Sequence, residues 1–344
     1  MRVLAPVTVA LIALSPAWTR PSYGGQEGER VVASVAGEVL TENQLEKLVS
    51  ADLALLRQQE YDLKMNALQS FVREKLIARE AAARGVEPQE MKRLIRDELK
   101  NKAQAAAAAD PRLVPGGVIG SAEPPPGSAA GGGQARSMTD EYLSEENWRF
   151  MRDLRRKYGV RLNLDPPRIA VEAGDDPALG PPDARVTVVA FLDYECTPCA
   201  EEAAALRRLQ QRFPKDVRVV VRDFPLASHP NSARAAQAAA CAGEQGRFWE
   251  MHDRLFADQR KLQGEDLKAY ARDLSLDGSR FAECLDGTRG TPEWRADRAD
   301  GERFGVRGTP TVFVNGRLVP RGGGYIAVWS LVQDELDLLS SPAR

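Results

Sequence analysis

Two cysteines, separated by two residues, directly follow a segment that predicts a buried strand. The segment "RVTVVAFLD" (Arg185 to Asp193) is rich in β-branched and apolar residues, and "YECTPCA" (Tyr194 to Ala200) comes next. Apolar residues then recur at helical spacing in "AEEAAALRRLQQRF" (Ala200 to Phe213), and "VRVVVRDF" (Val217 to Phe224) predicts a second buried strand. Strand, helix and strand in this order build a parallel sheet. The cysteine pair therefore lies where the first strand ends and the helix begins.

This position has a chemical consequence for the first sulfur. At a helix N-terminus, unpaired backbone N–H groups and the helix dipole favour negative charge, so the thiolate of Cys196 is stabilised. The thiolate is the species that attacks a disulfide, which makes Cys196 the candidate nucleophile. Cys199, one turn further along, is the candidate resolving thiol, and Pro198 fits the first turn because its missing N–H needs no partner there.

Two other interpretations of the pair remain open but are less favoured. A zinc site needs four ligands, usually in paired short spacings, and the other cysteines, Cys241 and Cys284, stand alone. No metal site is therefore expected. A purely structural 196–199 disulfide would close so small a loop that it would constrain the unfolded chain little.

The beginning of the chain predicts export. Met1 and Arg2 supply a positive charge and the apolar run Val3 to Leu14 has signal-peptide length, so residues 1–22 are predicted to be a signal peptide. Its cleavage or its retention as an anchor stays open. We expect a periplasmic or cell-envelope protein, where disulfides persist. The net charge of −2 gives no reason to expect a nucleic-acid partner, and the basic segment Arg152 to Arg161 is interpreted as a solvated helix face.

A chain of 344 residues is long enough for two domains, and its composition suits a folded protein. We predict a mostly helical domain over residues 29–165, with Thr41 capping the first of at least three helices. An Ala-, Gly- and Pro-rich segment, residues 105–136, is predicted to be a disordered insertion. The apolar residues expected to form the helical core recur at spacings of three and four residues, and Trp148 is expected to widen the same face. They are Leu68, Phe71, Val72, Leu76, Leu143, Phe150, Met151 and Leu154.

The second domain is predicted over residues 168–341. Helical patterns fill residues 231–286, with interruptions near Gly246 and Gly264, and a further helix covers about 293–304. "TPTVFVNGRLV" (Thr309 to Val319) predicts a hairpin, because Asn-Gly suits a type I′ turn. A last amphipathic helix covers 325–339.

These motifs together resemble the DsbA-like family of thioredoxin-fold proteins: a strand, Cys-x-x-Cys, a helix, a helical insertion, and then "GVRGTPTVFVNG". The resemblance implies an α/β thioredoxin fold with a helical insertion. It also implies a cis peptide bond between Thr309 and Pro310, close to Cys196. In that arrangement Thr309, Pro310, Thr197 and Pro198 contact the substrate, and the Thr309 backbone pairs with a bound peptide.

The chain also departs from the family pattern. Thr-Pro separates the cysteines where the strongest oxidants have Pro-His, and Ala190 stands where thioredoxins commonly have a buried carboxylate. Asp193 and Glu195 are nearby acids and are expected to be solvated. Related dithiols span about −270 to about −120 mV, so the motif leaves the direction of exchange open. Export favours a disulfide oxidase, with an isomerase or reductase as the alternative.

The remaining cysteines and histidines are assigned structural roles. In an exported chain with four cysteines, a disulfide between Cys241 and Cys284 is favoured over two free core thiols. His229 and His252 are interpreted as structural or surface residues.

The first domain resembles the N-terminal helical chaperone region of SurA-like foldases, through "VVASVAGEVLTENQLEKL" and the helical pattern of residues 67–91. A dimerisation arm or spacer is the alternative. The expected partners are unfolded or reduced exported proteins and a quinone-linked membrane partner for recycling, and no dissociable cofactor is needed. The rival from another class is a holdase chaperone whose dithiol is idle.

Overall fold

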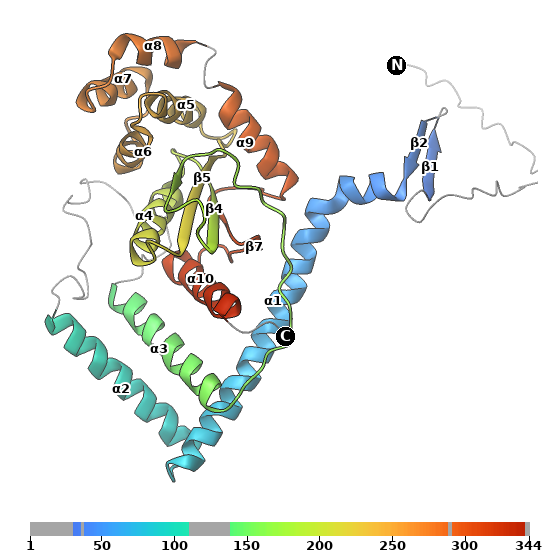
Figure 1. Cartoon of the computed structure of the whole chain (residues 1–344), viewed down its shortest axis with the longest axis vertical. Helices are drawn as coiled ribbons and strands as arrows, with labels where there is room; N and C mark the ends of the chain where they lie inside the picture. The colour runs from blue at the N-terminus through green and yellow to red at the C-terminus, as the bar shows by residue number, and fades with distance from the viewer. Residues whose placement is uncertain (1–29, 36–37, 110–137, 288–290, 341–344) are drawn as a thin grey trace, which may run out of the picture. The chain divides into compact units, whose positions relative to one another are not determined.

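A computed structural model describes residues 30–35, 38–109, 138–287 and 291–340 (Figure 1). The described residues divide into two compact units, one ending at Ser50 and the other beginning at Ala51. The predicted signal peptide and residues 110–136 of the predicted insertion lie outside the described residues. The predicted domain boundary between residues 165 and 168 falls within the second unit and stays a prediction.

The first unit is a small hairpin followed by the start of a helix. Strands β1 (Val31–Val35) and β2 (Glu38–Thr41) pair antiparallel, and α1 (Glu42–Ala83) follows directly. Thr41 caps α1 as predicted: its hydroxyl accepts from the Gln44 N–H at 3.3 Å, and its own N–H donates to the Gln44 side chain at 2.8 Å. This reciprocal pair satisfies two donors at the helix start.

The N-terminal part of the second unit consists of long helices. α1 continues to Ala83, and after a turn at Gly85, with φ of 67°, α2 covers Pro88–Ala109. α2 therefore extends into the first residues of the segment predicted as disordered. Helix α3 covers Met138–Lys157.

The predicted helical core forms in part. One cluster of apolar side chains joins α1 to α3 and contains Val72, Leu76, Met151 and Leu154. Two members of the predicted set belong elsewhere. Phe71 is 57% exposed, and Trp148 packs edge to face on Trp329, 5.0 Å between ring centroids. Helical spacing alone had placed both on the wrong face.

The second unit contains a five-stranded mixed sheet in the order β3-β5-β4-β6-β7. β4 and β5 are parallel, as the strand-helix-strand pattern predicted, and β6 and β7 form the predicted hairpin. Its turn residues Asn315 and Gly316 have φ of 46° and 78°, the positive values that a type I′ turn requires. The strands are β3 (Ala178–Leu179), β4 (Val186–Leu192), β5 (Val217–Asp223), β6 (Thr311–Val314) and β7 (Arg317–Leu318).

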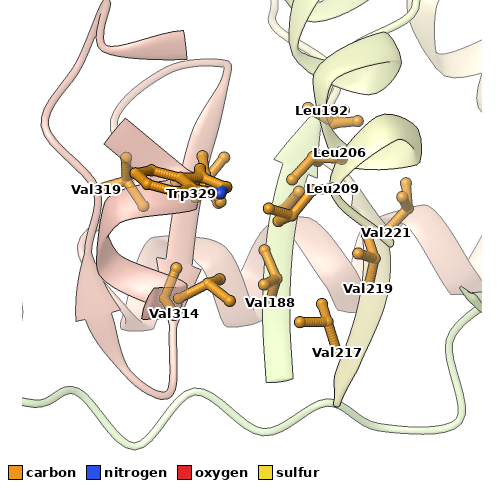
Figure 2. Close-up of a cluster of buried hydrophobic side chains, with 14 of the residues drawn as sticks. Val188, Leu192, Leu206, Leu209, Val217, Val219, Val221, Val314, Val319 and Trp329 are labelled. Carbon is orange, nitrogen blue, oxygen red and sulfur yellow. The ribbon is translucent and has the colours of Figure 1, made fainter. Parts of the chain in front are cut away.

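Helices cover both faces of this sheet. On one face, α4 (Thr197–Arg212) and α10 (Gly324–Ser340) bury valines of β4, β5 and β6 together with Trp329 (Figure 2). On the other face, Phe191 and Phe313 pack with Phe224, and α9 (Thr291–Arg303) contacts β5. Burial on both faces explains why the strands are near-continuous apolar runs.

A helical insertion separates β5 from β6. Its helices are α5 (Ser232–Gly243), α6 (Phe248–Ala257), α7 (Gly264–Asp273) and α8 (Gly278–Asp286), followed by α9. The insertion has its own core, in which α5 contributes mainly alanines. A disulfide joins Cys241 on α5 to Cys284 on α8, with 5.7 Å between their Cα atoms. The small alanine side chains let the neighbouring helices approach closely.

Candidate active site

The Cys196–Cys199 pair lies at the N-terminus of α4. Cys196 is the N-cap residue, with extended backbone angles (φ −80°, ψ 114°), and Thr197 and Pro198 form the exposed first turn. The Cys199 N–H donates to the Cys196 carbonyl at 3.0 Å. The geometry predicted from the sequence is present, with the first sulfur at the helix end and the second one turn inside.

The two thiols differ in exposure and acidity. Both are free thiols; Cys196 is 6% exposed and Cys199 is fully buried. A hydrogen bond from the Cys199 thiol is the main factor that lowers the pKa of Cys196 to about 6, and Thr309 and the Cys199 N–H act in the same direction. Burial, followed by the interaction with Cys196, raises the pKa of Cys199 far above the ordinary value of a thiol. Only the first sulfur is therefore ionised near neutral pH.

The Thr309–Pro310 segment lies beside the dithiol. The peptide bond between them is cis, and the Thr309 carbonyl oxygen is 3.5 Å from the Cys196 sulfur. Both residues are partly exposed. The structure thus brings Thr309 next to the Cys196–Cys199 pair, although Thr309 comes 113 residues after Cys196 in the chain.

Asp193 is buried, which corrects the expectation that it is solvated. Its carboxylate is 1% exposed and accepts hydrogen bonds from the Glu195 N–H, the Leu226 N–H and His229 Nδ1, at 2.8 to 2.9 Å. These contacts connect the loop that carries Cys196 to the loop after β5. The burial of Asp193 is explained by its three donors, because a buried charge is tolerated only where hydrogen bonds replace its hydration.

Glu195 is partly exposed and has a similar connecting role. Its carboxylate accepts from the N–H of Asn231 at 2.8 Å and from the Asn231 side-chain amide at 3.1 Å. The acid therefore holds the active-site loop to the start of α5 rather than pointing freely into solvent.

Sequence reasoning missed Gln259. Its side-chain amide donates to the carbonyl oxygens of Tyr194 and Cys196, both at 2.8 Å. The residue belongs to the loop after α6, so the insertion fixes the backbone on which the nucleophile is carried. A lone glutamine in a loop has no sequence signature, and only the fold places it here.

The insertion also packs an aromatic group against this loop. The Tyr194 hydroxyl is 2.9 Å from His252 Nδ1, and both side chains are buried. Burial lowers the pKa of His252 to about 3, so its ring is neutral at physiological pH. His229 and His252 thus have the structural roles that the sequence predicted.

One buried carboxylate lies on α4 itself, one turn after Cys199. Glu202 is 9% exposed, and its Oε1 atom has no hydrogen-bond partner among the described residues. Burial raises the pKa of Glu202 to about 7. On β4, Ala190 is fully buried, and its methyl side chain offers no carboxylate near the dithiol. No group of three His, Cys, Asp or Glu side chains that could hold a metal ion is present among the described residues.

Comparison with known proteins agrees with this fold. Residues 172–329 match the family described as Thioredoxin. The five-stranded sheet and the helical insertion between β5 and β6 agree with this match, and this part of the chain has an α/β thioredoxin fold. The N-terminal region is mostly helical, and its likeness to SurA-like chaperones stays a prediction.

The curated relatives are longer proteins. The chain is 42% identical over 160 residues to Na(+)/H(+) antiporter NhaA 1 of Salinispora arenicola, covering 46% of this chain and 24% of the relative. It is 44% identical over 150 residues to Na(+)/H(+) antiporter NhaA 3 of Salinispora tropica, covering 43% of this chain and 23% of the relative. The chain thus spans about a quarter of the length of these relatives. None of the helices that the structure describes is long and apolar enough to cross a membrane.

Solved structures with a similar chain include a thioredoxin-like oxidoreductase from Silicibacter pomeroyi, at 30% identity and a TM-score of 0.43, covering 49% of this chain and 95% of that one. Oxidised BdbD from Bacillus subtilis has 23% identity and a TM-score of 0.43, covering 49% and 96%. DsbA from Chlamydia trachomatis has 18% identity and a TM-score of 0.45, covering 50% and 97%.

Proposed function

We propose that this protein exchanges disulfides with the thiols of exported proteins, with Cys196 as the attacking or attacked sulfur and Cys199 as the resolving one. The observation that carries the proposal is the asymmetry of the pair. Cys196 has a lowered pKa and a small opening to solvent, whereas Cys199 is fully buried with a raised pKa. An incoming sulfur therefore meets Cys196 first, and Cys199 acts only within the protein.

In the oxidase direction the electrons balance within the dithiol. A client thiolate attacks the Cys196 sulfur of the 196–199 disulfide, the S–S bond breaks, and Cys199 leaves and takes up a proton. A second thiolate of the client then attacks the client sulfur of the mixed disulfide, and Cys196 leaves as a thiolate. The client gains one disulfide, and the pair is left reduced by two electrons. A quinone-linked membrane partner, which accepts these electrons, would restore the disulfide.

The low pKa of Cys196 supports this direction. A stabilised thiolate stabilises the reduced protein and so makes its disulfide a stronger oxidant. Thr197 and Pro198 are exposed beside the sulfur, and Thr309 and Pro310 border it on the other side. We assign these four residues to contact with the client chain. The alternative is an isomerase or reductase, which uses the same sulfurs from the reduced state.

Equilibration of the 196–199 pair with glutathione tests both the activity and its direction. We expect a potential nearer to that of DsbA, about −120 mV, than to that of thioredoxin, about −270 mV. A value near thioredoxin's would reject the oxidase and favour a reductase. Cys196→Ala should abolish refolding of a reduced client, while Cys241→Ser, as a matched cysteine control, should retain it. Equal activity of Cys196→Ala and the parent would reject disulfide exchange altogether.

Export is part of the same proposal, because the oxidase direction needs a compartment where disulfides persist. Residues 1–22 are proposed to be the signal peptide that directs the chain to the cell envelope. The N-terminal sequence of the protein recovered from the envelope fraction of its natural host tests this. Recovery of the protein only from the cytosol would contradict it.

A second candidate function, a holdase chaperone, is favoured by one observation in the first unit. Many of its large apolar side chains are exposed rather than packed: Val31, Val32, Val35, Val39, Leu45 and Leu48. Exposed apolar patches of this kind bind unfolded chains or other proteins. Under this proposal, Val35→Ser with Leu48→Ser weakens the suppression of client aggregation, and Cys196→Ala leaves it unchanged. Loss of suppression in Cys196→Ala alone would reject a separate holdase function.

A further inference from the structure

The basic segment Arg152 to Arg161, expected to be a solvated helix face, lines a hollow of about 320 Å³ between α3 and α10. Four arginines line this hollow from the end of α3 and the loop after it, and two aspartates line it from α10. These residues are Arg152, Arg155, Arg156, Arg161, Asp334 and Asp337. We call them the arginine pocket. Its volume is at the lower end of the range for small-ligand sites.

The positive charge of the arginine pocket is not balanced by its carboxylates. Asp337 pairs with Arg156 at 3.2 Å across the two helices. No salt bridge of Arg155 or Arg161 is found among the described residues, although Arg155 interacts electrostatically with Asp334. Asp334 also interacts with Arg317, so the one remaining carboxylate of the pocket is shared among more than three arginines. Among the carboxylates that the structure describes, Arg152 pairs only with the exposed, neighbouring Asp153, at 3.7 Å. Like charges held this close repel one another, so an added anion would relieve the repulsion.

Two donors in the pocket also lack acceptors. The Nε atoms of Arg152 and Arg155 are buried and have no hydrogen-bond partner among the described residues. Buried N–H groups are nearly always bonded, so these two arginines have hydrogen-bonding capacity that the described residues do not use. The Trp148 ring lies 4.9 Å from the Arg152 guanidinium and supports that side chain against the wall of the pocket.

We propose that the arginine pocket binds a small ligand through a tetrahedral oxyanion, supplied either by a free phosphorylated solute or by the phosphate of a lipid head group. The planar guanidinium offers two parallel N–H groups that match two oxygens of such an anion. The proposal is independent of disulfide exchange, because no residue of the pocket belongs to the dithiol site.

Calorimetric titration of the full chain with sulfate and with pyrophosphate, at pH 7 and low ionic strength, tests the pocket. We expect saturable binding that weakens at least tenfold in Arg155→Gln. Arg96→Gln is the matched control, because Arg96 is an exposed arginine on α2 that forms no ion pair with a described residue. Asp334→Asn should change affinity in the opposite direction and tighten binding, which a misfolded variant would not do. Absence of saturable binding, or equal weakening in Arg155→Gln and Arg96→Gln, overturns the proposal.

Sedimentation with vesicles distinguishes the two sources of the anion. If the ligand is a lipid, the chain sediments with phosphatidylglycerol vesicles but not with phosphatidylcholine vesicles, and Arg155→Gln abolishes the difference. If the ligand is a free solute, sulfate or pyrophosphate binds and neither kind of vesicle does. Vesicle binding that is equal in Arg155→Gln and the parent, without saturable binding of the soluble anions, contradicts both arms.

Discussion

Replacing Cys199 tests how far the hydrogen bond from its thiol lowers the pKa of Cys196. In the native chain the Cys199 thiol is the largest factor that lowers the pKa of Cys196 to about 6. Cys199→Ala removes the donor, and Cys199→Ser keeps an O–H at the same place and is the matched control. Both variants leave the helix N-terminus and Thr309 unchanged. The comparison therefore measures the contribution of one hydrogen bond to the acidity of the nucleophile.

The magnitude follows from the strength of such a bond. Relative to an ordinary thiol at about 8.5, a pKa of about 6 corresponds to about 3.4 kcal/mol of preference for the thiolate. A hydrogen bond to a charged group contributes about 1.5–3 kcal/mol, so its removal should raise the pKa by about 1–2 units. At pH 6 the ionised fraction of Cys196 would fall from about one half to between about 1% and 10%.

The pH dependence of iodoacetamide alkylation at Cys196 gives this pKa directly. We expect a midpoint near pH 6 in Cys199→Ser and between about pH 7 and 8 in Cys199→Ala. Circular dichroism of both variants checks that the fold is intact. Equal midpoints in the two variants would refute the reasoning, because the thiolate would then be stabilised by the helix end and Thr309 without the Cys199 thiol.

Three further predictions concern stability. Burial raises the folded-state pKa of Glu202 to about 7, so the native chain should lose stability as pH rises from about 4.5 through 7. Glu202→Gln should remove this loss and gain about 1–3 kcal/mol at pH 8 in urea unfolding, with the exposed Glu172→Gln as an unchanged control. Cys241→Ser opens the loop of 43 residues closed by Cys284 and should cost about 4 kcal/mol by chain entropy, seen as a lower Tm with exchange activity retained. Gln259→Leu leaves two carbonyls near the dithiol without their donor and should cost about 1–3 kcal/mol in the same unfolding assay; an unchanged midpoint would show that water replaces the amide.

The thioredoxin fold could be predicted from the sequence because its signals are local. Buried strands, the helix after Cys196 and the Asn315–Gly316 turn each depend on residues that are neighbours in the chain. The helical region was predicted less well. Phe71 matched the helical spacing of a core residue yet is exposed, because α1 has partners on only part of its circumference and spacing cannot say which side is covered.

The candidate site divides in the same way. The motif identified Cys196 and Cys199, and the resemblance supplied Thr309. The burial of Asp193 and the contribution of Gln259 had no signal in the sequence, since both depend on donors or acceptors contributed by distant loops. An isolated acid after a strand is solvated in most proteins, and here three donors from the folded chain reverse that expectation.

The sequence by itself determined the order of strands and helices and the chemistry of a sulfur at the start of a helix, because both follow from residues close together in the chain. The tertiary structure decided which distant groups meet that sulfur: Thr309 approaches Cys196 across 113 residues, and Gln259 reaches its carbonyl from the insertion. It also decided that the basic face of α3, which is exposed at Arg156 as expected, lines a hollow. These contacts depend on how the elements pack, and the packing free energy is distributed over the whole core rather than encoded in any single segment.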